Sequence, residues 1–236
     1  MASEERTATA EESIELPTPV SEEDDVEVTH PGASDHDQDS SEPEELDAET
    51  RERRDAALAQ VRKLGDPALR ATALPVERFD EELAAEVERM GELMSDALGI
   101  GLAATQLGVL HRVLVYKAYV DDPVTALVNP ELEWASEELE AAMEGCLSLP
   151  GVHVEVERPA RVRVRARDES GAELALEAEG LEARVIQHEI DHLDGTLILD
   201  RISREQRKEA MRAMREGHSE GGVQAVGREQ VAGDGA

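Results

Sequence analysis

Residues 187–195 read QHEIDHLDG, in which His188 and His192 stand four positions apart. On an α-helix, residues i and i+4 lie on one face, so the two imidazoles could bind the same cation. Glu189 follows the first histidine and could accept a proton from a water molecule bound to that cation. An ordinary helix with two surface histidines fits the same pattern, so the segment alone leaves both interpretations open.

A tetrahedral metal site that keeps one position open for water requires a third protein ligand. Downstream, where a zincin-type endopeptidase would have it, the candidates are Asp194, Asp200 and His218, and none is persuasive. Upstream lies the one cysteine of the chain, Cys146, within EGCLSLPG at 144–151. A thiolate and two imidazoles would complete the ligand set. A small buried core residue, or a nucleophile with a histidine as its base, remain alternatives for this cysteine.

Three segments occur in the order GIGLAATQLG at 99–108, EGCLS at 144–148 and QHEIDHLDG at 187–195. Together they resemble the signature segments of the peptide deformylases, and GDPALRATALPV at 65–76 is similar to the usual opening segment of that family. The resemblance covers roughly residues 60–205. It implies a hydrolase that removes the N-formyl group from the N-terminal methionine of newly synthesised polypeptides and releases formate.

The resemblance also implies the ligands of the metal. Cys146, His188 and His192 would bind one divalent ion, which in the cell would be Fe(II). Mixed thiolate and imidazole ligation also accepts Zn(II), Ni(II) or Co(II), so the ligand types do not choose among these ions. Glu189 would carry the proton from the bound water to the departing amine.

Substrate contacts are carried over from the same motifs. Gln106 and the backbone N–H of Leu147 would donate to the oxyanion that forms when the formyl carbonyl is attacked. The backbone at Ile100 and Gly101 would pair with the extended substrate peptide as an added strand. The side chains expected to line an apolar methionine pocket lie on the helix before His188. The full set of expected substrate-binding residues is Ile100, Gly101, Gly145, Leu181 and Val185.

Two residues depart from the usual pattern of the family. Thr105 stands where that family most often has proline, which would relax the loop that holds Gln106. Arg184 is expected to point to solvent or to pair with a neighbouring acid, with a place at the pocket rim as the alternative. Both departures are expected to affect fine specificity and to leave the reaction itself unchanged.

Hydrophobic patterning predicts an α+β domain in which antiparallel β-sheets pack around a central metal-binding helix. The strands at 161–167 and 173–179 read RVRVRAR and ELALEAE and form a predicted hairpin. Outward arginines facing outward glutamates explain this run better than a nucleic-acid surface does. Helices are predicted at 81–98 (N-cap Asp80, stop Gly99), 181–193 and 203–216, with a short one starting in 51–62, and further strands at 112–118, 125–129 and 152–157.

Charge is concentrated at one end of the chain. The sequence has 55 acidic and 24 basic residues, a net charge of −31, and residues 1–50 hold 18 acids against one arginine. We expect 1–50 to be a disordered acidic tail, 51–216 the catalytic domain and 217–236 a flexible end. The tail would aid solubility or dock a basic partner. An acidic chain disfavours nucleic-acid binding, and hence specific DNA binding. A single cysteine and no long apolar run indicate a cytoplasmic protein without a membrane partner.

The helix expected at 203–216 carries five basic and three acidic residues. It could contact the ribosome, or it could be a solvent-facing helix anchored by Met211 and Met214. Two rival functions also remain: a zincin-type endopeptidase, and a metal-bound or ribosome-associated module without activity. The joint presence of Gln106 and Glu189 beside the ligands argues against such a module, because binding alone requires no proton carrier.

Overall fold

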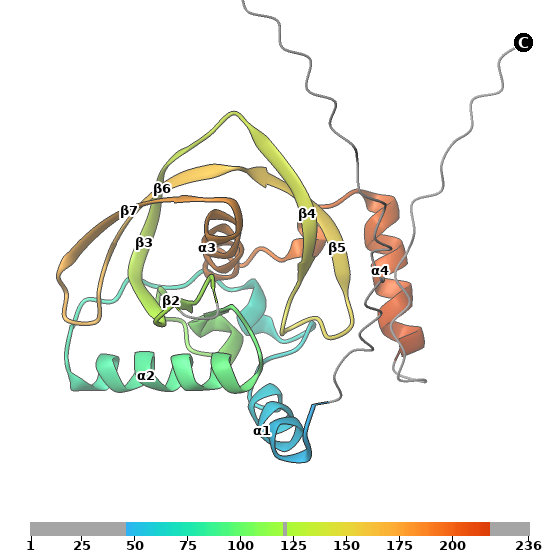
Figure 1. Ribbon diagram of the computed structural model, residues 1–236, viewed down its shortest axis with the longest axis horizontal. Coiled ribbons are helices and arrows are strands. Elements are labelled where there is room, and N and C mark those ends of the chain that lie inside the picture. Colours follow the sequence, from blue (N-terminus) through green and yellow to red (C-terminus); the bar gives the residue numbers. More distant parts are fainter. Residues whose placement is uncertain (1–45, 120–121, 218–236) are drawn as a thin grey trace, which may run out of the picture. The chain divides into compact units, whose positions relative to one another are not determined.

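Helix α3 (Gly180–Leu193) runs through the middle of the molecule and strands of two antiparallel sheets surround it (Figure 1). The computed structural model describes residues 46–119 and 122–217. The other helices are α1 (Ala48–Leu58), α2 (Glu81–Asp96) and α4 (Arg204–Gly217). The strands are β1 (Gly101–Ala103), β2 (Val113–Tyr116), β3 (Thr125–Ala135), β4 (Leu139–Gly145), β5 (His153–Pro159), β6 (Arg161–Arg167) and β7 (Glu173–Glu179). The α+β class expected from the sequence is confirmed.

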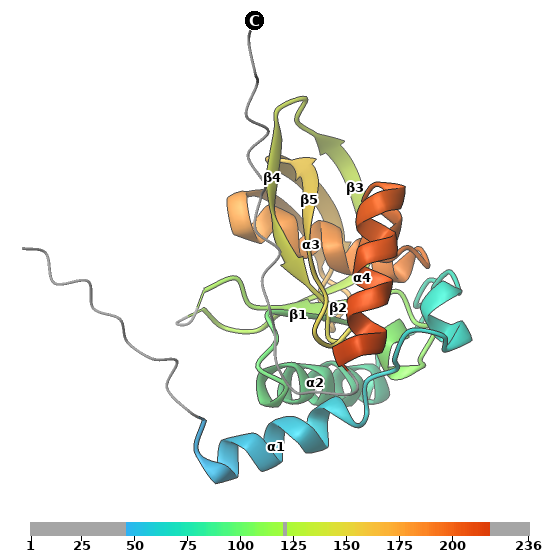
Figure 2. The same ribbon diagram turned by 90° about the vertical axis from the view of Figure 1, so that its right-hand side faces the viewer.

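The larger sheet has the strand order β1-β2-β3-β6-β7, and every neighbouring pair is antiparallel. Its strand β2 is buried on both faces, which explains the continuous apolar run VLVY. Val113 and Val115 pack with Met90 and Met94 of α2, whereas Leu114 packs with residues of α3. Helices α2 and α3 therefore cover opposite faces of β2, as Figure 2 also shows for α2. Helix α3 also packs against β1, which lies within the GIGLAATQ segment.

The smaller sheet consists of β4 and β5, with Gly145 paired to His153. The strand predicted at 152–157 is confirmed as β5. Its residues Val154 and Val156 are buried in a core with Ile198 and Leu199, which precede α4, and with Ala210 of α4. The sequence did not indicate β4, because LEAAMEG is rich in residues with high helix propensity. Pairing with β5 overrides that local preference.

The predicted hairpin is confirmed in its register, with Arg163 opposite Glu177 and Arg167 opposite Glu173. Both arginines make ion pairs with those glutamates. Arg165 instead pairs with Glu131 and Glu133 of β3, which lies on the other side of β6. Ion pairs with glutamates of β7 and β3, on the two sides of β6, therefore account for Arg163, Arg165 and Arg167.

Helix boundaries differ in detail from those expected. The side chain of Asp80 caps α2 by accepting from Leu83 N at 3.3 Å, as predicted. The predicted stop at Gly99 is wrong, because α2 ends at Asp96 and Leu98 takes the left-handed conformation at φ 57°. Helix α1 begins at Ala48, earlier than expected. Separately, no described helix is long and apolar enough to cross a membrane. Disorder was expected for residues 1–50 and 217–236. Of these, the structure describes only residues 46–50 and 217, and the others lie outside the described ranges.

Candidate metal centre

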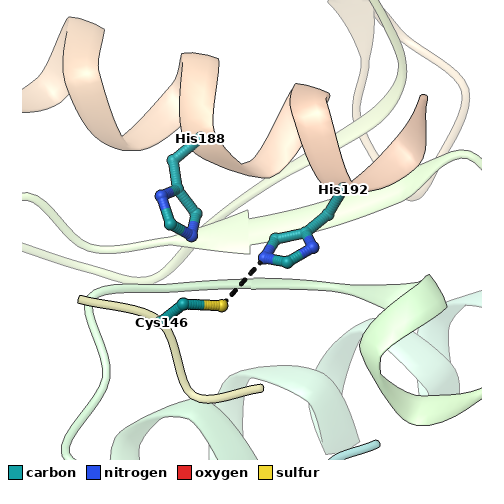
Figure 3. A group of neighbouring side chains, drawn as sticks. All are labelled: Cys146, His188 and His192. Atoms are coloured by element: carbon teal, nitrogen blue, oxygen red, sulfur yellow. Dashed lines mark hydrogen bonds between the residues drawn. The ribbon is translucent and has the colours of Figure 1, made fainter. Parts of the chain in front are cut away.

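Helix α3 and the turn after β4 bring the three predicted ligands together. His188 and His192 project from the same side of α3 toward the turn that carries Cys146 (Figure 3). The sulfur of Cys146 lies 3.2 Å from Nε2 of His192, and one ligand atom from each of the three residues lies within 4.8 Å of the others. Bonds of about 2.0–2.3 Å to a single ion fit this spacing. The arrangement can therefore hold one divalent metal ion.

The protonation state of His192 suits this role, whereas His188 must release a proton to bind the metal. Burial opposes the charge of His188, but hydrogen bonds with Cys146 and Glu144 raise its pKa to about 10. Nδ1 of His188 lies 2.9 Å from Oε2 of Glu144, which leaves Nε2 of the ring free to face the sulfur and the second imidazole. Burial lowers the pKa of His192 well below its usual range, and the charge of His188 adds to that effect. A neutral imidazole is the form that binds a metal.

Glu189 is buried beside the ligands. Among the residues that the structure describes, its Oε2 atom has no hydrogen-bond partner. Burial raises the pKa of Glu189 to about 7, against a smaller opposing effect of the His188 charge. A carboxyl that gains and loses a proton near neutral pH is suited to general acid–base catalysis. The unpartnered oxygen offers an acceptor to a water molecule at the metal.

A buried charge network behind His188 was not foreseen. Glu144 accepts from Arg158 at 2.6 and 2.9 Å, and Arg158 also donates to Asp191 at 2.9 Å. Burial opposes ionisation of Glu144, but the hydrogen bonds from His188 and Arg158 and the charge of Arg158 lower its pKa to about 2. The alternation of β5 could have revealed part of this network, since Arg158 shares the buried face of Val156. A buried arginine on a strand requires a carboxylate partner.

Arg184 joins the same network. Its side chain is only 9% exposed, so the expectation that it points to solvent is wrong. The expected pairing with an acid is met by Glu144 at 2.8 Å. It also donates to the carbonyl oxygens of Val156 and Glu140 at 2.9 and 2.7 Å. The guanidinium group of Arg184 thus links α3 to both strands of the smaller sheet, β4 and β5.

Gln106 lies in the short 3-10 helix Ala104–Leu107 and is buried next to the sulfur. Its Oε1 accepts from Ala103 N at 2.8 Å, which fixes the orientation of the amide. Its Nε2 then faces Ser148 Oγ at 3.2 Å and Cys146 Sγ at 3.8 Å. Thr105 donates to the carbonyl of His192 at 3.1 Å. The threonine therefore ties the Gln106 loop to the end of α3, which differs from the looser loop that we expected.

A cavity of about 620 Å³ opens at the ligands. A side chain at Gly101 would overlap the carboxylate of Glu189, so the close approach of these segments requires glycine there. The wall also includes Arg54 and Leu58 of α1, which no motif indicated because they precede the recognised segments. Every residue expected to contact the substrate lines this cavity, together with two of the ligands: Ile100, Gly101, Gly145, Leu147, Leu181, Val185, Cys146 and His188.

The alternative third ligands lie elsewhere. Asp194 pairs with Arg112 at 2.7 Å, and Asp200 pairs with Arg70. Neither belongs to the ligand cluster among the described residues, and His218 lies outside those residues. The zincin-type arrangement therefore lacks its downstream ligand in the described part of the chain.

A thiolate and two imidazoles beside a buried carboxylate, at the wall of a cavity in an α+β domain, define a metallohydrolase of the type that attacks amides. A sequence model of the polypeptide deformylase family matches residues 58–208. The chain belongs to this family. It is a hydrolase that removes the N-formyl group from newly synthesised polypeptides.

Individual relatives agree with this assignment. The peptide deformylase of Acidothermus cellulolyticus is 49% identical over 160 residues, which cover 68% of this chain and 87% of the relative. The crystal structure of the Thermotoga maritima peptide deformylase aligns with a TM-score of 0.59 at 46% identity, covering 61% of this chain and 96% of that one. The structure from Legionella pneumophila aligns with a TM-score of 0.64 at 38% identity, covering 67% and 94%. The acidic N-terminal residues lie outside the family match.

Proposed function

We propose that Cys146, His188 and His192 bind one divalent metal ion, which is Fe(II) in the cell, and that Glu189 is the proton carrier of the deformylation reaction. The observation that carries this proposal is the convergence of the three ligand atoms within 4.8 Å beside the buried Glu189 carboxylate. When bound, the ion supplies a Lewis acid that lowers the pKa of water toward neutrality.

Glu189 accepts a proton as the water oxygen attacks the formyl carbon. The same carboxyl then gives that proton to the departing amine while the C–N bond breaks and formate is released. Nε2 of Gln106 and the N–H of Leu147 donate to the formyl oxygen, on which negative charge develops. The fixed amide of Gln106 supports this role, because its Oε1 is already held by Ala103 N.

The cavity gives the substrate its orientation. The peptide backbone lies along Ile100 and Gly101 as an added strand, and Gly145 also lines the cavity. The methionine side chain fills the apolar region next to Leu181 and Val185 on α3. This placement brings the formyl carbon to Glu189 and the ligands.

The activity test uses protein loaded anaerobically with Fe(II) or Ni(II) and a formyl-Met-Ala peptide. The loaded wild type should release formate, and Glu189→Ala should keep its metal and release none. Glu155→Ala, which alters an exposed glutamate of β5, is the matched control and should behave as wild type. Absence of formate from the loaded wild type would contradict the proposed function.

The identity of the ion is a separate proposal. A soft thiolate with two imidazoles accommodates Fe(II), and such a site would be sensitive to oxygen through oxidation of Cys146. Metal analysis of protein purified anaerobically from the native host should find about one iron per chain. Zinc or nickel in place of iron would refute the proposed ion and leave the ligand set intact.

Helix α4 is proposed to contact the ribosome, in keeping with a cytoplasmic protein that acts on nascent chains. Arg204 and Lys208 are exposed, whereas Arg207 and Arg212 pair with Asp200 and Glu216. Cosedimentation with ribosomes should be lost when residues 203–236 are deleted and reduced in an Arg204→Glu, Lys208→Glu double variant. Equal sedimentation of all three proteins would end this proposal.

The catalytic domain is proposed to begin with α1. Ala57 of this helix is buried, and Leu58 packs against the core that contains α2. The expected start at residue 51 therefore moves to about Asp47, whose side chain caps α1 at Thr50 N. Limited proteolysis should leave a fragment that retains α1, and cleavage within 48–58 at low protease concentration would contradict this boundary.

A further inference from the structure

Helix α1 contributes to the substrate cavity from outside the family motifs. The family match begins at residue 58, and Arg54 lies one turn earlier on α1. Both Arg54 and Leu58 line the cavity that contains Cys146 and Glu189. Ala57 is buried next to them, so α1 is packed onto the domain and does not merely precede it.

Arg54 lies at the mouth of the cavity, because its side chain is 34% exposed whereas Glu189 is buried. The formyl end of a substrate must reach the buried end. The residues after methionine then leave through the mouth of the cavity, whose wall includes Arg54 and Leu58 of α1. A peptide strand advances about 3.3 Å per residue, so one or more of these residues would meet Arg54 and Leu58.

In the described part of the chain, Arg54 is the one Asp, Glu, Lys or Arg residue of the cavity wall that is not buried, although the chain has a net charge of −31. The other arginine in the wall, Arg184, is buried and bonded to Glu144. Within residues 46–119 and 122–217, the one ion pair of Arg54 is with its exposed neighbour Asp55, at 2.9 Å, and this aspartate does not line the cavity. An exposed ion pair of this kind contributes little energy, so a substrate carboxylate can replace Asp55 as the partner of Arg54.

We propose that α1 forms a subsite for the substrate segment that follows formylmethionine, in which Arg54 binds an acidic side chain and Leu58 contacts its apolar stem. This inference rests on the proposed function of the site. It makes deformylation faster for chains with aspartate or glutamate shortly after methionine. The rate of the chemical step should be unchanged, because Arg54 would contact the residues after methionine and not the formyl group.

The test uses C-terminally amidated peptides, formyl-Met-Ala-Ala-Ala, with Asp, Asn or Lys placed in turn at the second, third and fourth positions. At one position, wild type should prefer Asp over Asn by roughly 2- to 5-fold in kcat/KM, the range of a partly exposed ion pair. The difference should lie in KM and shrink with added salt. Arg54→Ala should abolish the preference, and Arg54→Glu should transfer it to the lysine peptide.

Two further variants isolate the charge. Arg53→Ala is the matched control, since Arg53 is exposed on the same helix, bonds to Thr50 at 3.4 Å and does not line the cavity. Asp55→Asn removes the competing carboxylate and should strengthen the preference for aspartate. Metal content and thermal stability should stay unchanged in every variant.

Equal kcat/KM for the Asp and Asn peptides at every position in wild type would overturn the subsite, and so would equal effects of Arg54→Ala and Arg53→Ala. Failure of the proposed function looks different, because no peptide would then release formate from the metal-loaded wild type.

Discussion

Replacing Glu144 by glutamine should destabilise the protein and weaken metal binding together. Its carboxylate accepts from Arg158, Arg184 and His188, and all four side chains are largely buried. The pKa of Glu144 is lowered from 4.5 to about 2, which corresponds to about 3 kcal/mol of stability at pH 7. An amide would leave Arg158 with Asp191 as its acid partner, and Arg184 with only the carbonyl oxygens of Val156 and Glu140 as partners among the described residues. A loss of about 3–5 kcal/mol is therefore expected.

The dependence on pH follows from the direction of this shift. A carboxyl with a folded-state pKa below its unfolded value stabilises the protein above the unfolded pKa and loses that effect as pH falls. The difference in the free energy of unfolding between wild type and Glu144→Gln should therefore have its full value at pH 7. It should decline below pH 4.5 and reach about half its value near pH 3.

Urea unfolding of the metal-free proteins at several pH values measures the loss of stability. For a domain of this size, a loss of about 3–5 kcal/mol at pH 7 corresponds to a fall of about 6–20 °C in Tm. Chelator competition with Co(II) measures the weakening of metal binding. The affinity should fall by about 10- to 100-fold, because Glu144 orients His188. Glu140→Gln, an exposed glutamate on the same strand, is the control. A Glu144→Gln protein within about 0.5 kcal/mol of that control would refute the reasoning.

Substitutions at three further positions test single roles. Gln106→Ala should lower kcat by about 100- to 1,000-fold with unchanged metal content, because one donor to the developing oxyanion is lost; a change in KM alone would contradict that role. Glu189→Ala should lower formate release by at least about 100-fold with the metal retained, and loss of the metal would show that this residue is a ligand. Thr105→Val should cost about 1 kcal/mol of stability and Thr105→Ser almost none, because the hydroxyl bonds to the carbonyl of His192; equal urea midpoints for the two variants would exclude this bond as a contributor.

The sequence was informative where a pattern has a fixed spatial period. The i, i+4 spacing of His188 and His192 placed both on one face of α3, and strand alternation gave the β6–β7 hairpin with its charge pairs. Motif order then identified Cys146 as the third candidate ligand. These features depend on local geometry or on recognised segments, so they do not require knowledge of the packing.

Other features depend on which segments meet. Glu144 has helix-favouring neighbours, and only the pairing of β4 with β5 turns it inward toward Arg158. Arg184 was expected at the surface because nothing in its own segment shows that β4 and β5 cover this part of α3. The place of Arg54 in the cavity wall also depends on how α1 packs, which helical periodicity alone does not specify.

The most direct test of the central claim is X-ray absorption spectroscopy of the metal-loaded, anaerobic protein. One bound ion per chain should show one sulfur neighbour at about 2.3 Å and nitrogen or oxygen neighbours at about 2.0–2.1 Å. The sulfur contribution should disappear in Cys146→Ser. A loaded wild-type protein without a sulfur neighbour would contradict the assignment of Cys146, His188 and His192 as the ligands of one metal.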